Sequence, residues 1–165
     1  MSYSKEKEMY EDVRSWLDDL LVDNFPKAQV ITEITSEYKL SDFLRKNGYQ
    51  KYFNQHPTFE IFTDVTGIII HDKRADLFFV ECKLQKIQLK DIGQIWGYSK
   101  VANPISSLII SPNGNTPSVD TLLLTYDRTD ILNYNHNRTI KLAKWDKNKK
   151  DMDYGSIIPK GSKLI

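Results

Sequence analysis

Cysteine is almost absent from this chain. Its 165 residues include one cysteine, Cys82. A single cysteine excludes an intrachain disulfide and any zinc site built from cysteine ligands. The three histidines, His56, His71 and His136, are scattered along the chain and do not match the spacing of zinc ligands. The sequence therefore gives no sign of a disulfide framework or of a zinc site.

Long apolar runs are also missing. No run approaches the roughly 20 residues that a helix needs to span a bilayer, and the first residues, MSYSKEKEMYEDV, are too charged for a secretory signal. A content of 40% hydrophobic and 12% aromatic residues favours a folded globule. We therefore expect a soluble, cytoplasmic protein without a membrane partner, folded as a single domain over residues 1–165.

The net charge of +1 excludes an obvious polyanion binder, although the charge is distributed unevenly. Residues 1–24 contain three basic and seven acidic side chains, whereas residues 138–165 contain eight basic and three acidic ones. The basic C-terminal segment could meet phosphates. It could equally be a solvated lysine-rich surface.

Hydrophobic periodicity predicts a mixed α/β domain with one central sheet. The expected helices cover residues 4–24, 40–53, 87–102 and 117–127. The expected strands cover residues 28–34, 59–71, 76–83, 107–111, 130–134 and 139–145. Ser4 is the expected cap of the first helix. We also expect Trp16, Trp96 and Trp145 to pack in the core.

The most informative segment is the expected hairpin FEIFTDVTGIIIHDKRADLFFVECK, residues 59–83. A turn centred on Asp72-Lys73 would put Asp64 opposite Glu81, and a turn centred one residue later would put Asp64 opposite Lys83. Either register brings Asp64, Glu81 and Lys83 to one face of the sheet. Cys82 should face the opposite side.

This cluster predicts phosphodiester hydrolysis. Closely spaced carboxylates repel each other and need a cation to be ionised together. Their hard oxygen ligands suit Mg²⁺, with Mn²⁺ as a possible substitute, and a bound metal activates water and stabilises charge on a phosphate. Lys83 could orient or deprotonate the attacking water, or stabilise the developing negative charge.

Asp64, sixteen intervening residues and then Glu81-x-Lys83 resemble the PD-(D/E)xK phosphodiesterase superfamily of restriction-endonuclease-like nucleases, which includes Holliday-junction resolvases. The resemblance implies an α/β fold with a restriction-endonuclease-like core. That core has a central mixed β-sheet flanked by helices in the order α-β-β-β-α-β, here with an extra C-terminal helix and strands. Thr63 stands where proline is common, a variation that keeps the Asp64 ligand.

The resemblance implies further site residues. Family members often place a glutamate on the first helix, for which Glu11 is the preferred candidate and Glu8 the alternative. Many also have a Gln-x-x-x-Tyr pattern on the helix after the third strand, here Gln94 and Tyr98, with Lys90 one turn earlier. These last three are candidates to bind substrate: Lys90, Gln94 and Tyr98.

The leading hypothesis is a Mg²⁺-dependent DNA endonuclease in which Asp64, Glu81, the Cys82 carbonyl and Glu11 or Glu8 hold the metal. It would cut double-stranded or branched DNA, as a homodimer with one site per strand. The alternative is a non-catalytic nuclease-like module that binds DNA or protein in a larger complex. A third hypothesis, an unrelated α/β interaction domain, requires the motif side chains to lie apart, and Asp64 and Lys83 could also form a merely structural ion pair.

Overall fold

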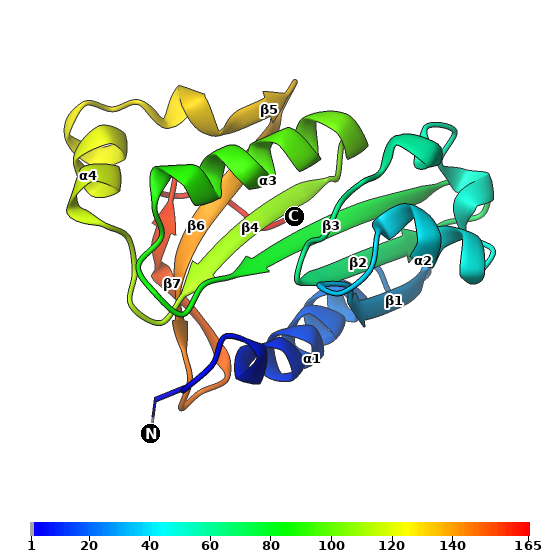
Figure 1. Cartoon of the computed structure of the whole chain (residues 1–165), viewed down its shortest axis with the longest axis horizontal. Coiled ribbons are helices and arrows are strands. Elements are labelled where there is room, and N and C mark those ends of the chain that lie inside the picture. Colours follow the sequence, from blue (N-terminus) through cyan, green and yellow to red (C-terminus); the bar gives the residue numbers. More distant parts are fainter. Residues whose placement is uncertain (1) are drawn as a thin grey trace.

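The computed structural model describes residues 2–165. Its helices pack around one central sheet, as Figure 1 shows. The helices are α1 (Lys7–Asn24), α2 (Leu40–Lys46), η1 (Gln50–Tyr52), η2 (His56–Thr58), α3 (Leu89–Ala102), α4 (Pro117–Asp120), η3 (Thr121–Thr125) and η4 (Thr129–Leu132). The strands are β1 (Gln29–Ile34), β2 (Val65–Ile70), β3 (Ala75–Cys82), β4 (Ser106–Ser111), β5 (Asn133–Asn135), β6 (Arg138–Asp146) and β7 (Asp151–Ile158).

The strands form an open, mixed sheet of seven strands in the order β1-β2-β3-β4-β6-β5, with β7 also paired to β6. Strand β2 runs antiparallel to both of its neighbours, β1 and β3, whereas β3, β4 and β6 are parallel. The predicted order of helix, strands, helix, strand is confirmed. Helix α3 is the crossover that joins the parallel strands β3 and β4, as a parallel pair requires.

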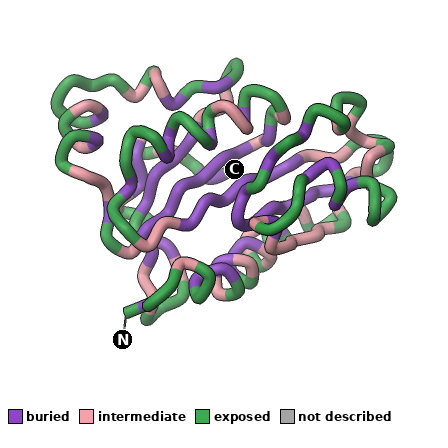
Figure 2. Tube along the Cα trace, in the orientation of Figure 1, coloured by how far each residue is buried: buried purple, intermediate pink, exposed green. Residues whose placement is uncertain are grey.

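Each face of the sheet is covered by a separate apolar layer. Alternation along β3 sends Leu77 and Phe79 to the layer that also contains residues of α2 and α3. Phe78, Val80 and Cys82 point to the layer that contains α1. The predicted opposite orientation of Cys82 is therefore confirmed, and Figure 2 shows that the central strands are buried along most of their length.

A glycine lets helix α1 approach the sheet closely. A Cβ atom built on Gly67 of β2 would lie 2.6 Å from Leu21 Cδ1 and 3.3 Å from Phe78 Cβ. These separations are shorter than ordinary van der Waals contact. Gly67 thus allows the short distance between α1 and the sheet. The pairing of β2 with β3 is continuous through Gly67, so this glycine does not mark a bulge.

Several element boundaries differ from the sequence-based expectation. Helix α1 begins at Lys7, and the Ser4 hydroxyl donates to Glu8 Oε1 at 2.6 Å instead of capping the helix. Residues 59–64 approach the sheet without joining it as a strand, and the segment before β5 forms the short helix η4. Strand β7 was not predicted, because its sequence DMDYGSII mixes polar residues and a glycine into a weak alternation.

The C-terminal hairpin of β6 and β7 packs against α1. Trp145 of β6 meets Trp16 of α1 edge to face, with ring centroids 5.8 Å apart. The Trp145 indole also donates to the Tyr3 hydroxyl at 3.0 Å. These two tryptophans are buried as expected, but the expectation is wrong for Trp96, which is 37% exposed and donates to the Asn133 carbonyl.

Within residues 2–165, none of the helices is both long and apolar enough to cross a membrane.

Candidate active site

Asp64 lies at the point where the chain enters β2. The main chain at this point is held by a hydrogen bond from Thr35 N–H to the Asp64 carbonyl at 2.9 Å. Beside it, the buried hydroxyls of Thr35, Thr63 and Thr66 form a network, with Thr35 and Thr63 each within 2.8 Å of Thr66. Thr63, the residue before Asp64, thus helps to fix the position of Asp64.

The pairing of β2 with β3 brings Asp64 to Glu81. Val65 pairs with Val80, and the turn at Asp72-Lys73 is closed by a hydrogen bond from His71 N–H to the Arg74 carbonyl at 2.8 Å. Continuing this register by one residue puts Asp64 opposite Glu81, the first of the two predicted registers. The Asp64 carboxylate accepts a hydrogen bond from Cys82 N–H at 2.8 Å.

Both carboxylates are taken out of water. Asp64 and Glu81 are each only 5% exposed. Burial raises the pKa of Asp64 to about 6. Burial, followed by repulsion from Asp64, raises the pKa of Glu81 to about 8. The pair therefore favours at least one proton at neutral pH, unless a cation neutralises it.

The two oxygens of Glu81 differ in their contacts. Within residues 2–165, the buried Oε2 atom has no hydrogen-bond partner, although Oε1 meets the Lys83 ammonium at 3.3 Å. A buried carboxylate oxygen without a partner costs free energy unless a ligand compensates it. Together with the Asp64 carboxylate, this atom fits a hydrated Mg²⁺ ion, which takes one or two carboxylates and keeps several waters.

Asp64 and Glu81 alone do not supply a complete set of metal ligands. Among residues 2–165, no three histidine, cysteine, aspartate or glutamate side chains are arranged as a metal-binding group. The donor set therefore suits an ion that keeps open positions for water and substrate rather than a fully protein-ligated ion.

Lys83 lies at the same end of β3, where its N–H donates to the Ile110 carbonyl at 2.8 Å. Its ammonium group lies between Glu81 and Asp91, whose Oδ1 is 3.8 Å away. Burial alone would lower the pKa of Lys83, but attraction to Glu81, Glu6 and Asp91 outweighs burial and raises it. In this molecule Lys83 is therefore a cation beside the carboxylate pair.

The glutamate at the beginning of α1 whose charge acts on the pair is Glu6, whereas Glu11 and Glu8, the predicted candidates, have other partners. Glu6 immediately precedes α1, and its Oε2 accepts from Leu84 N–H at 3.2 Å. Its charge raises the pKa of both Asp64 and Glu81. Glu11 is instead exposed and paired with Arg14, and Glu8 is hydrogen-bonded to Ser4.

Tyr10 is a second residue of α1 at the site. Its side chain is buried, and burial followed by the charge of Asp64 raises the pKa of Tyr10. Glu6 and Tyr10 are four residues apart and thus lie on one side of the helix. The spacing alone does not single out Glu6, because Glu8 and Glu11 lie in the same acidic segment.

The predicted substrate-binding residues on α3 lie on the exposed side of that helix. Gln94 donates to the Tyr98 hydroxyl at 3.3 Å, so the expected contact along one helical face is present. Lys90 and Gln94 are exposed and Tyr98 is half-buried. The α3 residue that contacts the site is Asp91, which sequence reasoning missed although Gln88-x-x-Asp91 has the spacing of a capping box.

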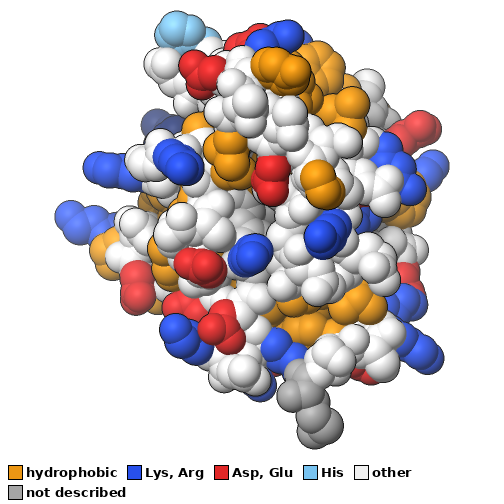
Figure 3. Space-filling model, turned by 90° about the vertical axis from the view of Figure 1, so that its left-hand side faces the viewer, with side chains coloured by type: hydrophobic (Ala, Val, Ile, Leu, Met, Phe, Trp, Pro, Cys, Tyr) orange, Lys and Arg blue, Asp and Glu red, His pale blue; other side chains and the backbone are white. Residues whose placement is uncertain are grey.

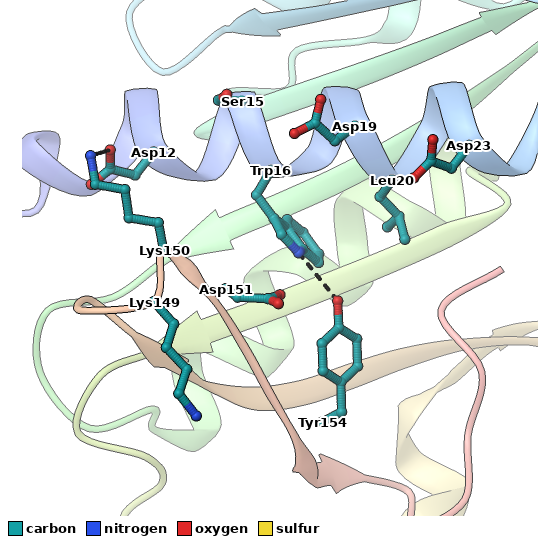
Figure 4. Close-up of a pocket in the computed structure, with 10 residues that line it drawn as sticks. All are labelled: Asp12, Ser15, Trp16, Asp19, Leu20, Asp23, Lys149, Lys150, Asp151 and Tyr154. Atoms are coloured by element: carbon teal, nitrogen blue, oxygen red, sulfur yellow. Dashed lines mark hydrogen bonds and ion pairs between the residues drawn. The ribbon is translucent and has the colours of Figure 1, made fainter.

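The pocket drawn in Figure 4 lies elsewhere, between α1 and the β6–β7 hairpin. It has a volume of about 460 Å³, and four of its lining residues are aspartates: Asp12, Asp19, Asp23 and Asp151. Lys150 of the basic C-terminal segment pairs with Asp12 at 3.0 Å, so part of that positive charge is neutralised within the molecule. On the face drawn in Figure 3, basic and acidic side chains are likewise interspersed.

Comparisons with models of protein families, with curated proteins and with solved structures find no match to this chain.

Proposed function

We propose that this protein is a metal-dependent endonuclease that hydrolyses phosphodiester bonds in DNA. The observation that carries the proposal is the buried pair of Asp64 and Glu81, with one unpartnered oxygen, beside the cation Lys83. Two carboxylates at the end of neighbouring strands are costly for a stable fold. A site for a divalent cation and a phosphate offsets this cost.

Asp64, Glu81 and the main-chain carbonyl of Cys82 would hold Mg²⁺ or Mn²⁺, with Glu6 at the border of the site. When bound, the ion would supply charge stabilisation for the phosphate and a water molecule of lowered pKa. The site lies at the carboxyl end of β3, next to the beginning of α3. In sheets with parallel strands, ligands commonly bind at this edge.

Lys83 would stabilise negative charge on the phosphate or orient the attacking water. Its position 3.3 Å from Glu81 supports this role, because it places a cation next to the carboxylate pair. Lys90, Gln94 and Tyr98 would contact the DNA backbone from the exposed side of α3. Since one chain contains one such site, cutting both strands of a duplex would require a symmetric dimer or two successive events.

The test is cleavage of supercoiled, linear and branched DNA with Mg²⁺, with Mn²⁺ and with chelator. We expect metal-dependent cutting by the wild type, and a loss of about 100- to 1,000-fold in Asp64→Asn, Glu81→Gln and Lys83→Ala. The order in which nicked and linear plasmid appear reports whether one or two sites act together.

Glu37→Gln is the matched control. Glu37-Tyr38-Lys39 is a second Glu-x-Lys sequence, but Glu37 is exposed and pairs with Lys7, so this variant should cut like the wild type. Cutting that survives in all three site variants would refute the proposal. DNA binding without cutting on every substrate would favour the alternative, a non-catalytic nuclease-like module.

A further inference from the structure

Lys83 is held between carboxylates from two different elements. Its ammonium lies 3.3 Å from Glu81 Oε1 on β3 and 3.8 Å from Asp91 Oδ1 on α3. The Lys83 side chain is 21% exposed, whereas Asp91 is only 7% exposed. A charged aspartate in the first turn of a helix is common, but a nearly buried one that faces a partly buried charge of opposite sign needs a further explanation.

The two oxygens of Asp91 have different partners. Its Oδ2 accepts from Gln88 N–H at 2.8 Å, which closes the capping box at the beginning of α3. Its Oδ1 faces Lys83. The capping bond prevents free rotation of the carboxylate, so the negative charge has a fixed position relative to the lysine.

The segment between Lys83 and α3 is itself held in place. Ser111 donates to the Gln85 carbonyl at 2.8 Å, and Asn113 donates to the Leu84 carbonyl at 2.6 Å. Ile87 N–H donates to the Gly114 carbonyl at 2.9 Å. Because this connection is anchored to the end of β4, Asp91 and Lys83 keep a defined separation.

We propose that Asp91 is a positioning residue, which holds the Lys83 ammonium beside Glu81 for the hydrolysis proposed above. A free lysine side chain samples many rotamers and is strongly hydrated. Asp91 is a second carboxylate in contact with the ammonium and restricts that sampling further, so that the cation is ordered before a phosphate arrives. This inference rests on the proposed function of the site.

Two variants separate positioning from helix capping. Asp91→Asn keeps an oxygen that can accept from Gln88 N–H but removes the negative charge that faces Lys83. Gln88→Ala removes the side-chain half of the capping box and leaves the contact between Asp91 and Lys83 intact. The first variant therefore tests positioning, and the second is its structural control.

We expect Asp91→Asn to lower kcat about 10- to 100-fold with little change in KM, as for other residues that orient a reacting group. Gln88→Ala should lower Tm and leave kcat within about twofold of the wild type. Asp91→Glu, which keeps the charge on a longer arm, should recover part of the lost kcat. The proposal would be overturned if Asp91→Asn had the same kcat as the wild type. It would also be overturned if kcat fell in proportion to Tm in both Asp91→Asn and Gln88→Ala.

A second readout does not depend on activity. In nitrogen-15 spectra of the lysine ammonium groups, assigned with Lys83→Gln, the Lys83 signal should be visible in the wild type and in Gln88→Ala. In Asp91→Asn it should broaden through faster exchange with water. An unchanged signal would contradict the inference. If the wild type cuts no DNA while the signal behaves as expected, the proposed function fails and the positioning of Lys83 by Asp91 stands.

Discussion

Glu81 and Asp64 are buried next to each other at a cost to the metal-free protein. The pKa of Glu81 is raised from its ordinary value of 4.5 to about 8, first by burial and then by Asp64. The folded protein thus binds this proton more tightly than the unfolded chain does. The stabilisation is complete below the unfolded pKa of about 4.5 and is lost as the pH rises through about 8.

In chelator, we therefore expect the wild type to lose thermal stability between about pH 5 and about pH 8. Glu81→Gln removes this titration, so its Tm relative to the wild type should rise over the same interval by about 3 °C or more. Thermal unfolding followed by circular dichroism measures the difference.

Adding Mg²⁺ at about pH 8 should raise the Tm of the wild type but not that of Glu81→Gln, because the ion binds only the folded site. Glu37→Gln, at an exposed position, should follow the wild type throughout. A Tm gap between Glu81→Gln and the wild type that stays constant with pH would show that the buried carboxylate does not titrate as described.

At the scale of elements, the packing of α1 on β2 determines which residues of α1 reach the site. Gly67 leaves room for Leu21, and the same helix presents Tyr10 to Asp64 and begins next to Glu6. The position of α1 in the packed core thus determines that Glu6 lies near Asp64 and Glu81.

Gly67→Ala should destabilise the protein by about 1–3 kcal/mol, because its Cβ would lie 2.6 Å from Leu21 Cδ1 in a packed layer. Urea unfolding measures the change. Gly93→Ala on α3 is the control, since among residues 2–165 a Cβ there meets no atom within 4 Å apart from its chain neighbours and the nearby backbone of its own helix. That variant should gain about 0.5–1 kcal/mol from helix propensity. Equal effects at the two glycines would contradict the close packing of α1 on β2.

At the scale of the whole molecule, the two ends of the chain pack against each other. The β6–β7 hairpin reaches α1 through Trp145, Trp16 and Tyr154, whose hydroxyl accepts from the Trp16 indole at 3.3 Å. Lys150 adds an ion pair to Asp12. The β6–β7 hairpin thereby stabilises α1, the helix that contains Tyr10.

Trp145→Phe should lower the free energy of unfolding by about 1–2 kcal/mol, because it removes a buried hydrogen bond to Tyr3 and shortens the contact with Trp16. Trp96→Phe also loses an indole hydrogen bond, but at a position that is 37% exposed. It should cost clearly less in the same denaturant titration. A larger loss of unfolding free energy in Trp96→Phe than in Trp145→Phe would contradict the stabilisation of α1 by the β6–β7 hairpin.

The sequence by itself determined the features that depend on local patterns. Two apolar runs separated by charged turn residues predicted the hairpin of β2 and β3, and the two candidate turns, centred on Asp72-Lys73 or one residue later, limited its register to two possibilities. Because side chains on a strand alternate with a period of two, either register brought Asp64, Glu81 and Lys83 to one side. The α/β class and the succession of the main elements followed from the same periodicities.

Only the tertiary structure decided which residues complete the cluster. The local sequence does not distinguish Glu6 from Glu8 and Glu11. Glu6 lies at the site because of where α1 begins and how closely α1 packs on Gly67 of β2. The contact of Asp91 with Lys83 depends on the anchoring of the connection before α3 to the end of β4. These are contacts between segments distant in sequence, whose free energies depend on packing and desolvation rather than on the propensity of any short segment.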